Sequence, residues 1–245
     1  MGRRSARDTE RVFVVEGPTL LDEALAAGAP VEAVFVAPGH PELGPVARAW
    51  ERGVRVHDLA PGVLERIAAT VTPQPVLSIV SMRDVAVGDL AGPGPVIVCV
   101  DVRDPGNLGT VLRSAEASGA AGVVCCDGTV DVYNPKCVRA SAGALFHVPI
   151  VAGGAPMTVL DSLAAGGRRR LGTAVAQGSA YTETDLTGPI AVVLGNEAHG
   201  LSADLARGLD GFIHVPIDGR SESLNVGIAC AVVCFEAARQ RRVSS

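Results

Sequence analysis

The sequence predicts an α/β protein with two domains, of which the larger, C-terminal one is built on a parallel sheet. Several apolar runs, among them residues 96–100 and 190–194, are continuous rather than alternating, and strands of this kind are buried on both faces by helices. Helix-like sequence lies between most of these runs. Glycines and prolines gather at residues 83–95, a composition that suits a linker between domains.

The N-terminal segment alternates short strands with helices, so we expect a small α/β domain there. Pro18 suits the first turn of a helix, and Gly28 suits its C-terminal end. Strands are expected at residues 12–15, 34–36, 54–56 and 77–80, and further helices at 46–50 and 63–68. We therefore place the domains at residues 1–85 and 95–245, with a linker at 86–94.

The C-terminal segment carries the buried strands and ends in a long helix. Strands are expected at residues 96–100, 122–126, 146–151, 171–175, 190–194 and 212–215. The last helix, about residues 222–239, is strongly apolar in its first half, so it lies either in the core or at a subunit interface. Ser221 and Ser223 are both candidates for its N-cap.

Composition narrows the class of protein. Hydrophobic residues make up 48% of the chain and the formal net charge is −5, which indicates a folded protein that does not coat nucleic acid through its whole surface. A local basic patch can still bind RNA. No apolar run approaches the roughly 20 residues of a membrane span, and no apolar stretch follows the basic N-terminus. We therefore expect a cytoplasmic protein.

The cysteines and histidines do not suggest a metal site. The 6 cysteines form no C-x-x-C pair, and Cys230 and Cys234, one helical turn apart, have apolar neighbours. Buried small side chains explain this pattern better than metal ligands do. The 5 histidines are scattered without metal-ligand spacing, so we expect no metal.

Polar, glycine-containing turns follow three of the predicted strands, at residues 101–115, 195–202 and 216–226. Ligands of parallel sheets bind at the carboxyl ends of the strands, so these turns form the candidate site. Taken singly, each turn also fits a plain helix cap, as Ser202 does before the next helix. The signatures of P-loops, dinucleotide-binding glycine loops and hydrolase nucleophile elbows are absent from the sequence.

Together the three turns resemble the motifs of the SpoU ribose methyltransferases, a branch of the SPOUT enzymes, whose catalytic domain forms a deep trefoil knot. The matching stretches read DVRDPGNLGTVLRSA from residue 101, LGNEAHGL from residue 194 and VPIDGRSESLNV from residue 215. One departure is Gly227, where relatives often have a serine, and we expect little consequence from it.

The resemblance extends over nearly the whole chain. Residues 134–146 look like the segment typical of members that act on large-subunit ribosomal RNA. Residues 13–17 and the following helix look like the N-terminal domain of those members, which is similar to ribosomal protein L30e and holds RNA. Members that act on tRNA usually lack this domain. The resemblance therefore implies an RNA 2′-O-ribose methyltransferase that acts on 23S rRNA.

The resemblance also implies S-adenosylmethionine as cofactor and a homodimer formed through the knotted domain, with no metal and no membrane partner. The cofactor-binding residues carried over by motif position are Thr173, Leu194, Gly195, Asn196, Val215, Ile217 and Leu224. The catalytic residues carried over are Arg113, Asn107, Glu197, Ser223 and Asn225. For RNA binding we expect Arg11, Lys136, Arg139 and Ser141.

Arg113 is implied as the central catalytic group. Because a guanidinium keeps its proton at neutral pH, we expect it to clamp an RNA phosphate and to stabilise charge on the ribose oxygen, rather than to act as a base. Asn107 would orient Arg113 or the ribose. Two alternatives stay open: a tRNA ribose methyltransferase of the same family, and an RNA-binding protein whose site is inactive.

Overall fold

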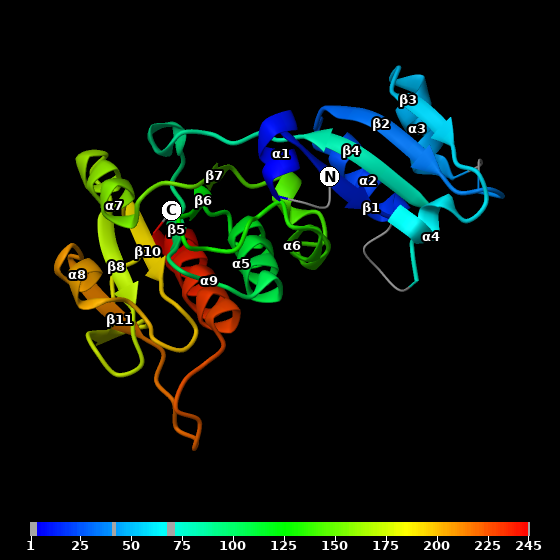
Figure 1. The fold of residues 1–245 in the computed structure, drawn as a ribbon. Coiled ribbons are helices and arrows are strands. Elements are labelled where there is room, and N and C mark those ends of the chain that lie inside the picture. Colours follow the sequence, from blue (N-terminus) through cyan, green and yellow to red (C-terminus); the bar gives the residue numbers. More distant parts are fainter. Residues whose placement is uncertain (1–3, 41–42, 68–71, 245) are drawn as a thin grey trace.

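The computed structural model of the chain describes residues 4–40, 43–67 and 72–244. It consists of two α/β units, each with its own sheet, which lie side by side in Figure 1. The N-terminal unit, blue to cyan, is the smaller one, and the chain then crosses to the C-terminal unit, green to red. This arrangement confirms the predicted α/β class.

The N-terminal unit has a mixed sheet. Its elements are α1 (Arg4–Glu10), β1 (Val12–Glu16), α2 (Pro18–Ala26), β2 (Val31–Val36), α3 (Gly44–Glu51), β3 (Arg55–Asp58), α4 (Val63–Ile67) and β4 (Val76–Ser81). The strand order is β1-β4-β2-β3, with β1 and β2 antiparallel to β4 and β2 parallel to β3. The predicted strands and helices are confirmed, α1 was not predicted, and the predicted helix end at Ala68 lies outside the described residues.

Helices α2 and α3 cover one face of this sheet. Val34 and Val36 point to that face and pack with Leu21 and Val46 of the helices, because alternate residues of a strand face opposite sides. Gly28 follows α2 with a φ of 64°, the left-handed conformation in which helices commonly end.

The C-terminal unit is built on a parallel sheet. Its elements are η1 (Val87–Asp89), β5 (Val96–Cys99), α5 (Pro105–Ala117), β6 (Gly122–Cys125), α6 (Pro135–Ala140), η2 (Ala144–Phe146), β7 (Ile150–Ala152), α7 (Pro156–Ala165), β8 (Arg169–Thr173), β9 (Ser179–Ala180), β10 (Ile190–Leu194), α8 (Ala203–Arg207), β11 (Gly211–His214) and α9 (Val226–Ser244). The strand order is β7-β6-β5-β10-β8-β11-β9, and these neighbours pair in parallel. The predicted parallel sheet is confirmed.

Both faces of this sheet are covered by helices. On β5, Ile97 and Cys99 pack against residues of α5, α6 and α9, whereas Val96 and Val98 pack against residues of α7 and α8. The continuous apolar strands of the sequence are therefore buried on two sides, as predicted.

Two predicted boundaries are wrong. Residues 146–148, predicted as the start of a strand, lie in and just after η2, because Gly143 takes a φ of 95° and turns the chain there; the strand begins at Ile150. The last helix begins at Val226 rather than at residue 222. Asn225, and not Ser221 or Ser223, caps it, since Asn225 Oδ1 accepts hydrogen bonds from the amides of Gly227 and Ile228 at 2.9 and 3.3 Å.

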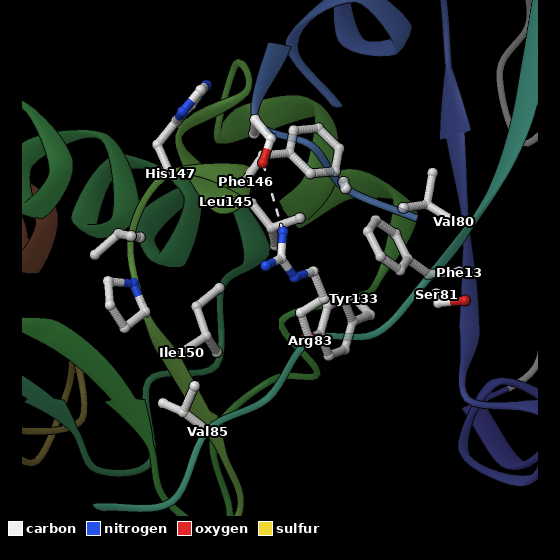
Figure 2. A pocket seen from close by; sticks show the side chains of 14 residues that line it. Phe13, Val80, Ser81, Arg83, Val85, Tyr133, Leu145, Phe146, His147 and Ile150 are labelled. Carbon is white, nitrogen blue, oxygen red and sulfur yellow. Dashed lines mark hydrogen bonds between the residues drawn. The ribbon is translucent and has the colours of Figure 1, made fainter. Parts of the chain in front are cut away.

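The two units share one apolar core at their junction. The ring centroid of Phe13, on β1, lies 4.8 Å from that of Tyr133 and 6.1 Å from that of Phe146. Figure 2 shows the cavity of about 290 Å³ at this junction, with Arg83 pointing into it from the segment after β4. Arg83 Nη1 donates to the carbonyl of Gly28 over 3.3 Å, so it links that segment to the end of α2.

Polar pairs join the same two units. The buried Arg7 donates through Nε to Asp131 over 3.2 Å, and His147 Nε2 lies 2.9 Å from Glu23 Oε2. Each pair joins a helix of the N-terminal unit to a loop of the C-terminal unit. Together with the shared core, they hold the units in one arrangement.

Over the described ranges, no helix has the length and apolar character to cross a membrane. The same part of the chain holds no group of three or more His, Cys, Asp or Glu side chains that could bind a metal ion. All 6 cysteines are buried and none forms a disulfide, which agrees with their apolar sequence neighbours.

Candidate active site

Three turns meet at the carboxyl edge of the parallel sheet. They follow β5, β10 and β11; β5 and β10 are neighbours, and β11 lies beyond β8 in the same sheet. The carboxyl ends of parallel strands lie at one edge, which is where such sheets bind ligands. Side-chain hydrogen bonds join the turns to one another. The structure thus brings together the three segments that the sequence singled out.

Glu197 ties the second turn to the first. Its carboxylate accepts hydrogen bonds from the amides of Arg103 and Asp104, both at 3.2 Å, and from Asn107 Nδ2 at 3.0 Å. Burial acts to raise the pKa of Glu197, but the hydrogen bonds from Asn107 and the backbone outweigh it and lower the pKa below its usual value. The ionised form of Glu197 is therefore stabilised by its hydrogen-bond donors.

Asn107 links the second turn to the third. It lies in the first turn of α5, where Asp104 caps the helix by accepting from the Asn107 amide over 2.8 Å. While its Nδ2 donates to Glu197, its Oδ1 accepts from Asn225 Nδ2 over 2.8 Å. A chain of hydrogen bonds therefore runs from Glu197 through Asn107 to Asn225, one residue from each turn.

Asn196 closes the second turn on itself and joins it to the first turn. Its Nδ2 donates to the carbonyl and carboxylate of Asp101 at 3.0 and 3.1 Å. Its Oδ1 accepts from the amides of Ala198 and His199 at 2.9 and 3.1 Å. Asp101 has a φ of 56°, which side-chain-bearing residues rarely adopt and which clusters at functional sites.

Gly195 allows the two ends of the second turn to touch. A Cβ atom at this position would lie 2.4 Å from the carbonyl carbon of Gly200 and 2.8 Å from the amide nitrogen of Leu201. Both neighbours are backbone atoms, which cannot rotate away as a flexible side chain would. The turn therefore requires glycine at position 195.

The three turns surround a cavity of about 630 Å³, a volume typical of small-molecule sites. Ten of the predicted site residues line it: Asn107, Thr173, Gly195, Asn196, Glu197, Val215, Ile217, Ser223, Leu224 and Asn225. Apolar walls are added by Val175, Leu201 and Phe212. The arrangement suits a ligand with an aromatic part and several polar groups.

Two of the predicted catalytic and cofactor-binding residues do not line the cavity. Leu194 is fully buried within β10, and its carbonyl accepts from the amide of Val100 over 2.9 Å. Arg113 is exposed on α5 and forms no hydrogen bond or ion pair with any residue that the structure describes. The predicted contact between Asn107 and Arg113 is not formed, because Asn107 bonds to Glu197 and Asn225 instead.

Two of the residues predicted to bind RNA are paired with carboxylates at the junction of the units. Arg11 forms an ion pair with Asp84, and Arg139 Nη1 lies 3.3 Å from Glu16 Oε2. To bind an RNA phosphate, each arginine would have to leave its carboxylate or contact the carboxylate and the phosphate together.

The other two predicted RNA contacts lie on and just after α6. Lys136 is exposed in the first turn of the helix. Ser141 is buried, and its hydroxyl donates to the carbonyl of Val138 over 2.7 Å. This placement favours a structural role for Ser141 and leaves Lys136 open to a ligand.

Several cavity residues were not singled out from the sequence. His199 and Glu222 lie in the second and third turns, at positions that the family motifs leave variable. Ala174, Val175 and Gln177 follow β8, whose predicted end at residue 175 lies two residues beyond its observed end at Thr173. The carboxyl-end rule applied to the observed end of β8 points to them. Ala229 and Val233 are four residues apart on α9, a spacing that marks one face of a helix.

Two family models match the chain. Residues 94–235 match the SpoU rRNA Methylase family, and residues 1–78 match the MRM3-like substrate binding domain. The first range contains all three turns of the cavity, and the second contains most of the N-terminal unit.

Named relatives are similar over nearly the full length. The 23S rRNA (guanosine(2553)-2′-O)-methyltransferase RlmP of Bacillus subtilis is 33% identical, covering 95% of this chain and 90% of the relative. The 23S rRNA (uridine(2479)-2′-O)-methyltransferase of Streptomyces viridochromogenes is 31% identical, covering 98% and 87%. The solved SpoU methyltransferase AviRb of S. viridochromogenes, in complex with AdoMet, superposes with a TM-score of 0.87 at 30% identity, covering 99% of this chain and 95% of that one. The chain belongs to the SpoU rRNA Methylase family.

Proposed function

We propose that this protein is an S-adenosylmethionine-dependent RNA 2′-O-ribose methyltransferase that acts on 23S rRNA. The observation that carries the proposal is the hydrogen-bonded chain from Glu197 through Asn107 to Asn225, which draws the three family segments around one cavity. The relatives named for 23S rRNA 2′-O-methylation match this chain along nearly its whole length, including the N-terminal unit. Family membership and site geometry thus support the same reaction.

The cavity fits the proposed cofactor. Its volume and its apolar walls suit an adenosine, and the backbone of the second turn approaches closely because Gly195 has no side chain. Thr173, Asn196, Val215, Ile217 and Leu224 would hold S-adenosylmethionine there, with Leu194 fixing the strand behind them. When bound, the cofactor supplies a methyl group on a sulfonium, ready for in-line displacement by a ribose oxygen.

The protein's own part in the reaction is alignment and charge stabilisation. Asn107, Glu197 and Asn225 hold the turns in register, and Ser223 shapes the wall nearest the third turn. The guanidinium of Arg113 holds an RNA phosphate and stabilises the charge that develops on the 2′-oxygen, while the proton lost by the 2′-hydroxyl passes to phosphate or water. Because Arg113 is exposed and unpaired within the described chain, its fork is available to an RNA strand laid across α5.

RNA is held by both units in this proposal. The N-terminal unit forms an L30e-like RNA-binding domain of residues 1–85, joined by a linker at 86–94 to the methyltransferase domain of residues 95–245. Arg11 and Arg139 lie at the junction of the two units and Lys136 is exposed on α6. All three would contact phosphates, with Ser141 supporting the helix end. The absence of a membrane-spanning helix in the described ranges agrees with a cytoplasmic enzyme acting on ribosomal RNA.

The C-terminal domain is knotted and dimeric in this proposal. In support of a knot, β10 lies between β5 and β8, and the segment after β11 returns to α5, where Asn225 meets Asn107. In support of a dimer, α9 and the turn before it carry exposed apolar side chains at helical spacing: Leu224, Ile228 and Phe235, exposed by 37, 49 and 47%. Single-sided apolar stripes of this kind mark protein interfaces.

The decisive experiment is to map 2′-O-methyl positions in ribosomal RNA incubated with the purified protein and cofactor. We expect one new 2′-O-methyl nucleotide in 23S rRNA and none in tRNA. Methylation of tRNA alone would show that tRNA, and not 23S rRNA, is the substrate. Cofactor binding without methylation of any RNA would show that the protein is a binding protein and not an enzyme.

A further inference from the structure

The cavity of about 290 Å³ at the junction of the two units, the junction cavity, is separate from the cavity proposed for the cofactor. Val148 and Ile150 line it just before and at the amino end of β7, whereas the three turns lie at the carboxyl ends of their strands. No residue that the structure describes lines both cavities. The volume of the junction cavity is close to the lower end of the range for small-molecule sites, roughly 300–1,000 Å³, so it suits a single ring system.

Aromatic and aliphatic side chains form most of the walls of the junction cavity. Phe13 and Tyr133 are almost fully buried there, and Phe146 is half-buried. Leu145 and Ile150 add aliphatic surface beside these rings (Figure 2). A flat ring can pack against such walls, as unpaired bases do on the aromatic side chains of RNA-binding proteins.

Arg83 brings a guanidinium into these apolar surroundings. Figure 2 shows its side chain pointing into the cavity from the segment after β4. Arg83 Nη1 donates to the carbonyls of Ala27 and Gly28 over 3.5 and 3.3 Å, which anchors the group on one side. Its Nε and Nη2 form no hydrogen bond with a residue that the structure describes. These two nitrogens make up one edge of the guanidinium, a fork of two parallel N–H donors.

No carboxylate among the described residues lines the junction cavity. Asp84, which follows Arg83 in the chain, accepts a hydrogen bond from Tyr133 and pairs with Arg11. The cavity therefore offers a pair of donors that lacks an acidic partner. Such a pair, set in apolar walls, favours an uncharged ring with two neighbouring acceptor atoms over a hydrated phosphate.

We propose that the junction cavity binds an unpaired guanine base of the RNA substrate, with Arg83 bonded to the base and Phe146 packed on its face. The inference rests on the proposed function and adds a recognition contact outside the site of methyl transfer. Guanine presents two adjacent acceptors, O6 and N7, to which an arginine fork binds bidentately. Adenine has a donor in place of O6, and pyrimidines have no N7, so either would leave an N–H of the fork unsatisfied.

Arg83 is a positioning residue for the RNA in this inference. The guanine it holds belongs to a nucleotide other than the target, because the target ribose must reach the cofactor cavity at the opposite edge of the parallel sheet. The contact therefore contributes to the affinity and selectivity for RNA and leaves the chemical step unchanged.

The test measures binding of the full-length protein to two 23S rRNA transcripts by filter binding. One transcript contains ordinary guanosine and the other contains 7-deazaguanosine, which lacks the N7 acceptor. Wild type should bind the 7-deaza transcript about tenfold more weakly, as expected for loss of a bidentate contact. Arg83→Gln should bind the ordinary transcript about tenfold more weakly than wild type does, and it should bind both transcripts equally.

Arg66→Gln is the matched control. Arg66 is an exposed arginine of the N-terminal unit that also donates to a backbone carbonyl, that of Gly62, and it lies outside the junction cavity. This variant should show the wild-type preference for the ordinary transcript. Calorimetric titration with S-adenosylmethionine tests the folding of both variants, and unchanged affinity is expected because neither residue lines the cofactor cavity.

Photocrosslinking locates the base. A 23S rRNA transcript that contains 6-thioguanosine, irradiated in complex with the wild type and digested, should yield crosslinked peptides that contain residues 145–150. Crosslinks confined to other parts of the chain would overturn the inference. So would equal binding of both transcripts by wild type, or a wild-type preference that persists in Arg83→Gln. If the wild type still methylates 23S rRNA in those cases, the proposed function stands; a wild type that neither binds nor methylates 23S rRNA overturns both.

Discussion

Asn225 Nδ2 donates to Asn107 Oδ1 over 2.8 Å, which joins residues 118 positions apart in the chain. Asn107 has both atoms of its amide in use, since its Nδ2 donates to Glu197. Asn225 uses its remaining oxygen to cap α9. One side-chain amide thus sets the spacing of all three turns, and the variants below follow from that geometry.

Replacing Asn107 by alanine should weaken cofactor binding more than it weakens the fold. It removes two hydrogen bonds at the cavity, each worth about 1 kcal/mol, so we expect affinity for S-adenosylmethionine to fall by up to roughly thirtyfold. Calorimetry measures this. Asn134→Ala, which removes the cap of α6 outside the cavity, is the control and should leave cofactor affinity unchanged. Equal loss in both variants would argue against a special role for Asn107.

Gly195→Ala should disrupt the second turn. Its Cβ atom would lie 2.4 Å from backbone of Gly200, so residues 196–200 must move and cofactor affinity should fall more than tenfold. Gly188→Ala, before the same strand, places its Cβ in open space and should bind as wild type. Thermal unfolding of both proteins separates loss of the turn from loss of the fold. A Gly195→Ala protein with normal cofactor affinity would contradict the close packing of the turn.

Arg113→Lys should reduce single-turnover methyl transfer by about a hundredfold, because lysine keeps the charge but loses the planar fork that holds phosphate. Cofactor affinity should not change, since Arg113 does not line the cavity of its own chain. Arg55→Lys, on the edge strand of the N-terminal unit, is the comparison and should retain wild-type turnover. A wild-type rate in Arg113→Lys would remove this residue from the mechanism.

Glu197 should make stability depend on pH in the acid range. The pKa of Glu197 is lowered in the folded protein, so its ionised form stabilises the fold. This stabilisation is fully present above the pKa of the unfolded state, about 4.3. It is lost as pH falls through the lower pKa of the folded state. Urea denaturation between pH 3 and 6 should therefore show a smaller acid loss of stability in Glu197→Gln than in wild type. Glu183→Gln, at an exposed site, should follow wild type. Identical pH profiles in the wild type and both variants would show that the hydrogen bonds to Glu197 do not stabilise the folded protein.

Phe235→Asp should separate the proposed dimer. It places a charge in the exposed apolar stripe of Leu224, Ile228 and Phe235, and burying an unpaired charge opposes association. Light scattering after size exclusion should give the mass of two chains for wild type and of one chain for the variant. Trp50→Asp, on α3 and 68% exposed, should remain dimeric. A wild-type protein with the mass of one chain would rule out the dimer directly.

Much of the fold follows from local sequence. The buried strands of the C-terminal unit are continuous apolar runs such as residues 190–194, and Pro18 and Gly28 mark the start and end of α2. The carboxyl-end rule also located the three turns, because it depends only on where strands end. These features need no knowledge of distant contacts.

The missed features depend on tertiary contacts. The turn at residues 216–225 stays non-helical because it lies along the cavity and its last residue bonds to Asn107, which local propensity does not encode. β9 has two residues and exists through its pairing with β11. The carboxylates that pair with Arg11 and Arg139 lie 73 and 123 residues away, so spacing along the chain gave no sign of them.

The ring contacts of Phe13 with Tyr133 and Phe146 also govern how the protein melts. Separating the units would expose these rings to water, at a cost proportional to the apolar area uncovered. Neither unit can then lose its structure while leaving the other intact, so heating should produce a single calorimetric peak rather than two. In the proposed function, RNA bound by the N-terminal unit is therefore held at a fixed distance from the cavity of the C-terminal unit.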